Sequence, residues 1–268
     1  MLKKLIKNEY IATARFMIPL YIVLAVLTVM NKIILMIEDN SQLGEVLGEN
    51  IVYNFVSGLL LVTYILSIFA VFALTVIFII KRFYDNMLKD EAYLSFTLPV
   101  TTKQHLYSKV VVSYTWIVVS SVVVMASLFV MGAGEGVTEE VNTVVKGLRQ
   151  LLEEGYGPEI LAGVVLVLIG IYNLILLPYT CFSIGQRMNG HPVIGAFVTY
   201  IVIYMINQII GIITLVVVFA GNTDGLEKMS DLQAYHYVII YEIVLMGVEA
   251  IVYTLITHHM LDKKLNLE

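Results

Sequence analysis

The chain has a single cysteine among its 268 residues and none of the common signatures of an enzyme. Cys181 can form no disulfide within the chain and no thiolate metal cluster, so we interpret it as a packing residue. The sequence contains no GxxxxGK[ST] phosphate loop, no HExxH and no GxSxG. His258 and His259 are adjacent, whereas helical metal ligands share a face when four residues separate them. We therefore predict that this chain is not an enzyme and holds no metal or cofactor of its own.

Charged residues are also scarce. They make up 14 % of the chain, against 59 % hydrophobic residues, whereas an average soluble domain has about 25 % charged residues. Apolar runs approach the roughly 20 residues that a helix needs to cross a bilayer, and they lack the alternation of transmembrane strands. This pattern predicts an all-α integral membrane protein with one domain over residues 1–268. The six expected spans cover residues 16–37, 55–80, 110–132, 160–182, 193–220 and 237–258.

Basic residues are distributed unequally between the segments that join these spans. By the positive-inside rule, lysine and arginine mark the cytoplasmic side. We therefore predict that four segments are cytoplasmic: both termini, the 81–109 loop and the short fourth loop. The net charge of the whole chain is −5, which gives no reason to expect nucleic-acid binding. Twelve of the sixteen basic residues lie in these four segments: Lys3, Lys4, Lys7, Arg15, Lys81, Arg82, Lys89, Lys103, Lys109, Arg187, Lys263 and Lys264.

The 81–109 loop is the densest polar segment of the chain. Pro99 disfavours helix at the residue before it, and Thr101 followed by Gln104 fits a capping box at the start of the next helix. We therefore predict a helix, an extended corner and a second helix. Two interpretations follow: a hairpin whose aromatic residues anchor at the lipid headgroups, or a rigid contact site for a cytoplasmic partner. The apolar residues of the first helix recur at near-helical spacing: Phe83, Tyr84, Met87, Leu88, Tyr93 and Leu94.

A second amphipathic pattern occupies the external segment 133–159. Glu139 and Glu140 lie near the expected helix start, and Gly155 lies just past its end. The predicted helix either covers the bundle, lies at the headgroups, or serves as a gate or lid for a substrate. Its apolar stripe consists of Val141, Val144, Val145, Leu148, Leu151 and Leu152.

Two acidic residues fall within the sixth expected span. Glu242 and Glu249 are seven residues apart and so lie on nearly the same helix face. A charged residue within a bilayer costs free energy unless it is paired, hydrated or protonated, which makes such residues functional candidates. The candidate partners are Asn173, Asn207 and Gln208 in other spans, tyrosine hydroxyls and water. Glu249, Asn173 and Gln208 either line a substrate path or form structural hydrogen bonds between helices. Glu242, nearer the outer surface, either lines that path or is solvated.

Three stretches of the chain resemble one protein family. They are KLIKNEYIATARFMIPLY at the amino terminus, FYDNMLKDEAYLSFTLPVTTKQHLYSK in the loop and CFSIGQRMNGHPVIG in the fourth loop. Together with the six-span layout, they are similar to permease subunits of ABC transporters, specifically the type-two exporters of Gram-positive bacteria. The resemblance implies an amino-terminal interfacial helix over Met1–Arg15 and a cytoplasmic coupling helix between spans two and three. The docking residues it implies are Asp90, Glu91, Tyr93, Leu94, Leu98 and Pro99, with Arg187 as a second contact.

The same resemblance implies partners. A separate ABC ATPase subunit would bind ATP and Mg²⁺, and a second permease subunit, identical or different, would complete the transporter. The implied function is export of a hydrophobic or amphipathic compound, such as a peptide or lipid-like molecule, across the bacterial plasma membrane. The alternative is a membrane sensor or scaffold that recruits a cytoplasmic partner without transport. One departure from the family pattern is the large external segment at 133–159, because family members often carry it between the last two spans.

Overall fold

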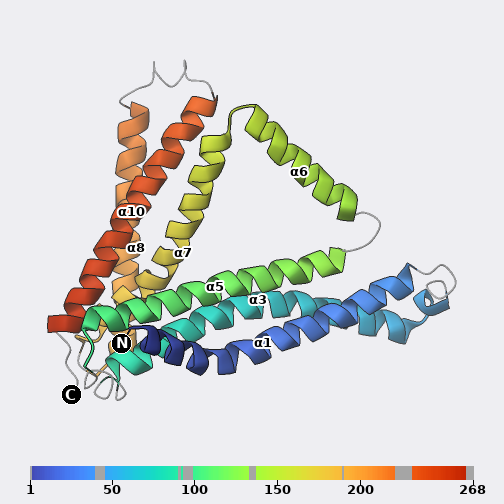
Figure 1. Cartoon of the computed structure of the whole chain (residues 1–268), viewed down its shortest axis with the longest axis horizontal. Helices are drawn as coiled ribbons and strands as arrows, with labels where there is room; N and C mark the ends of the chain where they lie inside the picture. The colour runs from blue at the N-terminus through green and yellow to red at the C-terminus, as the bar shows by residue number, and fades with distance from the viewer. Residues whose placement is uncertain are drawn as a thin grey trace. The chain divides into compact units, whose positions relative to one another are not determined.

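The computed structural model describes residues 2–39, 46–89, 92, 99–132, 137–188, 190–220 and 231–263. All regular structure in these ranges is helical, with no β-strand. Six of the helices are long and apolar enough to cross a membrane, which confirms the prediction of a multi-pass, all-α membrane protein. These helices are α1 (Leu2–Glu38), α3 (Ile51–Leu88), α5 (Thr102–Gly132), α7 (Gly157–Gly185), α8 (Pro192–Ala220) and α10 (Asp231–Lys263), labelled in Figure 1.

Helices α1 and α3 extend well beyond the spans expected from hydropathy. α1 is a single helix that includes residues 2–15 and contains Pro19, so no break separates an interfacial segment from a span. The interfacial helix implied by the family resemblance therefore stays a prediction. α3 continues past residue 80 to Leu88, because the segment beyond the apolar run contains neither proline nor glycine.

The start of α5 confirms the predicted capping box. The Thr101 hydroxyl accepts a hydrogen bond from the Gln104 amide N–H at 3.3 Å, and the Gln104 side-chain oxygen accepts one from the Thr101 N–H at 3.3 Å. These reciprocal bonds satisfy donors that the first helical turn otherwise leaves unpaired. Helix α5 therefore begins at a defined residue, Thr102, shortly after the bend formed by Pro99 and Val100.

Contacts along the chain divide it into two compact units, which are described separately. The first unit contains Lys3–Ile79 and Val111–Gly147, and the second contains Ile80–Val110 and Leu148–Glu268. Helices α3 and α5 therefore each contribute to both units. This division does not test the prediction that the whole chain forms a single domain.

The first unit is held together by hydrogen bonds between helices as well as by apolar packing. Ser120 on α5 bonds with Tyr21 on α1 at 2.7 Å and with Thr75 on α3 at 2.9 Å. One helical heptad further on, Ser127 bonds with Tyr64 of α3 at 3.3 Å. Both serines are buried, as is Ser113, so this seven-residue stripe lies where small side chains allow helices to approach closely.

In the second unit, α7 packs against both α10 and α8. Its polar residues again bond across helices: Tyr172 with Thr254 at 3.1 Å and Thr180 with Thr257 at 2.9 Å. The Thr180 and Thr257 side chains are fully buried. Such bonds matter within a membrane because lipid offers polar groups no alternative partner.

The turn that joins α7 to α8 brings two backbones into direct contact. A methyl group on Gly195 would lie 2.5 Å from the Gly185 carbonyl oxygen, and one on Gly185 would lie 2.7 Å from the Ala196 Cα atom. Only glycine allows this approach, because it has no side-chain carbon. Gly190, between them, has a φ of +84°, a backbone conformation that side chains rarely adopt. The sequence therefore specifies a tight turn here.

Helix α6 (Val137–Glu153) occupies the segment for which the sequence predicts an amphipathic helix. Gly155 follows with a φ of +93°. The amide N–H groups of Gly155 and Tyr156 bond to the carbonyl oxygens of Leu152 and Leu151, at 3.3 and 2.9 Å. This is the glycine-terminated helix end that the sequence indicates, and it leads directly into α7.

Candidate functional site

The candidate docking surface lies at the end of α3, at the start of α5 and in the α7–α8 turn. Pro99 and Arg187 are both exposed, Pro99 in the bend before α5 and Arg187 in the turn. The remaining predicted docking residues lie outside the described residues: Asp90, Glu91, Tyr93, Leu94 and Leu98.

The last two turns of α3 pack against α7. Phe83 stacks on Tyr179 with ring centroids 3.8 Å apart and an interplanar angle of 10°, and both side chains are almost fully buried. Met87 is fully buried as well. The neighbouring Tyr84 makes a tilted ring contact with Phe182 at 5.1 Å. Protein therefore covers this segment at Phe83 and Met87, so Phe83 is not one of the aromatic residues that could anchor a hairpin at the headgroups.

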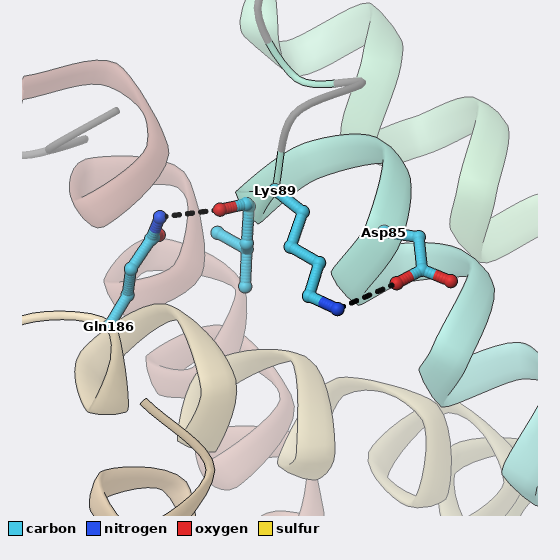
Figure 2. Close-up of polar contacts among 4 residues, drawn as sticks. Asp85, Lys89 and Gln186 are labelled. Atoms are coloured by element: carbon cyan, nitrogen blue, oxygen red, sulfur yellow. Dashed lines mark hydrogen bonds and ion pairs between the residues drawn. The ribbon is translucent and has the colours of Figure 1, made fainter. Parts of the chain in front are cut away.

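A hydrogen bond joins the end of α3 to the α7–α8 turn. The Gln186 side-chain amide donates to the Leu88 carbonyl oxygen at 2.7 Å (Figure 2). This carbonyl belongs to the last turn of α3, where carbonyl groups have no partner within the helix. Gln186 therefore caps α3 and positions the beginning of the segment that contains the predicted docking residues.

The outer side of the same helix end is charged. Lys89 lies 3.8 Å from the Asp85 carboxylate, one helical turn earlier, as Figure 2 shows. The Lys89 ammonium also lies 5.1 Å from the centre of the Tyr84 ring. Because the Lys89 side chain is 53 % exposed, this ion pair contributes little to stability and remains accessible to a partner.

The start of α5 contacts the end of α10 in the same unit. The Thr102 hydroxyl donates to the Asp262 carboxylate at 3.3 Å. Together with the Gln186 bond and the Phe83–Tyr179 stack, this contact joins the loop-side ends of α3 and α5 to α7 and α10. The two ends of the predicted contact loop are therefore fixed to one packed body.

A second group of candidates lies within the predicted spans. Asn173 of α7 is buried, and its side-chain amide donates to the Met246 carbonyl oxygen at 3.0 Å and to the Glu249 carboxylate at 3.4 Å, both on α10. Glu242 is partly buried on α10, and Gln208 is exposed on α8. The structure thus brings together Asn173 and Glu249 among the four candidates. The Asn207 side chain, adjacent to Gln208, instead donates to the Tyr253 hydroxyl at 3.1 Å.

Two residues that support the candidate docking surface from within the fold were not predicted from the sequence. Gln186 is one position from the predicted Arg187, and Tyr179 is a buried residue of the fourth span. Their roles depend on pairing with Leu88 and Phe83, more than 90 residues earlier in the chain. The available signal was the aromatic spacing of Phe83 and Tyr84 on one segment and of Tyr179 and Phe182 on another.

Comparison of the chain with protein-family models, curated proteins and solved structures gave no match.

Proposed function

We propose that this chain is the membrane-spanning permease subunit of an ATP-driven ABC exporter in the bacterial plasma membrane. The observation that favours this function is the fixed attachment of the 81–109 loop at its α3 end, through the bond from Gln186 to the Leu88 carbonyl. A loop that transmits force from a partner must be anchored to the helices that it moves. Here the anchor includes α7, the buried aromatic pair Phe83 and Tyr179, and the contact between Thr102 and Asp262.

In this proposal a separate ATPase subunit binds ATP and Mg²⁺ and docks on the segment 90–99 and on Arg187. The chain itself performs no chemistry. Movement of the docked ATPase displaces the ends of α3 and α5 together with α7, α8 and α10, because these parts belong to one unit. A second permease subunit completes the substrate path, and both termini lie on the ATPase side. The cargo is a hydrophobic or amphipathic compound, such as a peptide or lipid-like molecule.

The test is co-purification of this chain with a candidate ATPase subunit that contains a phosphate loop, sought among the products of neighbouring genes, followed by measurement of ATPase activity in liposomes. The triple variant Glu91→Ala, Leu94→Ala, Leu98→Ala should weaken association by roughly tenfold or more, since a single central interface residue is often worth about 2 kcal/mol. Arg187→Ala should also weaken it, and Lys146→Ala is the matched control. Arg187 and Lys146 are both exposed and basic, but Lys146 lies on α6, which is not one of the segments that make up the proposed docking surface.

Unchanged association and unchanged ATPase activity in the triple variant would contradict docking at this loop. Capture of a cytoplasmic partner that hydrolyses no ATP would instead support the sensor or scaffold function.

A further inference from the structure

Helix α6 has one apolar face that nothing in the described part of the chain covers. The side chains of its stripe are between 40 % and 62 % exposed, with Leu151 and Val144 at the two limits. The opposite face is polar, and there the Gln150 side chain donates to Glu154 at 2.9 Å. An exposed apolar stripe on a 17-residue helix that is otherwise polar is typical of helices that lie at a membrane surface.

Both ends of α6 are tied to membrane-spanning helices. Four residues separate the end of α5 at Gly132 from the start of α6, and three residues separate the end of α6 from the start of α7 at Gly157. Four residues reach at most about 14 Å even when fully extended, whereas a helix of this length measures about 25 Å. A helix fixed at both ends to spans that emerge on the same face of the membrane must therefore lie along that face.

The turn at the second end restricts α6 further. The N–H groups of Gly155 and Tyr156 bond back to the last turn of the helix, so the connection to α7 is an ordered corner. Within the 17 residues of α6, two basic and three acidic side chains nearly balance. Binding to lipid must therefore depend on the apolar area and not on attraction to anionic headgroups.

We propose that α6 is an interfacial helix whose partner is the lipid bilayer itself. Its stripe inserts at the boundary between headgroups and acyl chains, on the face of the membrane where α5 ends and α7 begins. The inserted residues are Val141, Val144, Val145, Leu148, Leu151 and Leu152. This assignment does not depend on the transport function, since it requires only that α5 and α7 span the membrane.

The test uses nitroxide labels on single cysteines in the full-length chain, reconstituted in phosphatidylcholine vesicles. Cys181, the only native cysteine, is first replaced by alanine. Labels at Val144→Cys and Leu148→Cys should collide more with oxygen than with a water-soluble nickel chelate, at a depth of about 5–10 Å. Labels at the control positions, Lys146→Cys and Gln150→Cys, should show the reverse preference. Adding anionic phosphatidylglycerol should leave the depth unchanged.

Two results would overturn the proposal. Equal access of the nickel chelate to the stripe and control positions would place the whole helix in water. Stripe labels that are immobile and reached by neither reagent would show that protein covers the stripe. In that case, labelled chain is diluted with unlabelled chain. The dilution would reduce label–label contact if a second copy covers the stripe, and would change nothing if the stripe packs within one chain.

Discussion

Gly185 and Gly195 are the residues of the α7–α8 turn that leave no room for a methyl group. Gly185→Ala places the new carbon against the backbone of Ala196, which cannot yield without moving α8. Overpacking of this kind costs about 1–3 kcal/mol, so we expect the melting temperature to fall by about 2–4 °C per kcal/mol. Thermal stability in detergent, followed by size-exclusion chromatography, measures this change.

Gly211→Ala is the control for that substitution. Gly211 lies within α8, and a methyl group there meets no atom within 4 Å. Alanine also favours helix over glycine by about 1 kcal/mol, so this variant should be as stable as the parent or slightly more stable. A loss of stability at Gly211 equal to that at Gly185 would show that close approach at the turn is not the cause.

Asn173 provides a second test at the scale of single residues, because it bonds to both a carbonyl group and a carboxylate on α10. Asn173→Ala leaves Glu249 and the Met246 carbonyl without this donor, and an unpaired buried group costs about 1–3 kcal/mol. Glu249→Gln keeps an oxygen that accepts the same bond and should cost less than about 1 kcal/mol. Unfolding in mixed detergent micelles measures the loss in the free energy of unfolding for each variant. The control is Gln208→Ala, which removes an exposed amide and should leave this free energy almost unchanged. A larger loss for Glu249→Gln than for Asn173→Ala would mean that the carboxylate has a structural role beyond this bond.

At the scale of helices, local signals predicted ends well when the signal lay within a few residues. The Thr101 and Gln104 capping box and Gly155 after α6 are examples, since each acts on the backbone next to it. The end of α3 was different. Hydropathy placed the end of the span near residue 80, but the helix continues to Leu88. The continuation is stabilised by the stacking of Phe83 on Tyr179 of α7, and the hydropathy of a single segment contains no information about that packing.

The same distinction applies to the candidate site. The sequence predicted the loop and its corner, because proline, charge and the capping residues mark a polar segment between two apolar ones. Arg187 followed from the family resemblance, and its role in docking stays a prediction. It did not identify Gln186 or Tyr179, because their partners are distant in the chain. For Glu249 the sequence predicted several possible hydrogen-bond partners, among them Asn173, and in the structure Asn173 makes this bond. Side-chain type thus predicted the need for a partner, whereas helix packing decided which partner it was.

At the scale of the whole molecule, the division into two units shows which helices form one unit with the 80–110 segment. The segment belongs with α7, α8 and α10, although the remainder of α3 and α5 belongs to the other unit. In the proposed function, a force applied to the loop would act on the three carboxyl-terminal helices through contacts within this unit. This arrangement suits a subunit that receives energy from a partner at one side of the membrane, which is the function proposed above.

The orientation of that side is itself testable, because twelve of the sixteen basic residues lie in segments predicted to be cytoplasmic. In a Cys181→Ala background, Lys3→Cys and Arg187→Cys should resist a membrane-impermeant maleimide in intact cells, and Gln150→Cys should react. All three native side chains are exposed in the structure, so folding does not hide them. Permeabilised cells are the control, and there all three positions should react. Labelling of Lys3→Cys or Arg187→Cys from outside would reverse the topology and place the proposed docking surface beyond the reach of a cytoplasmic ATPase.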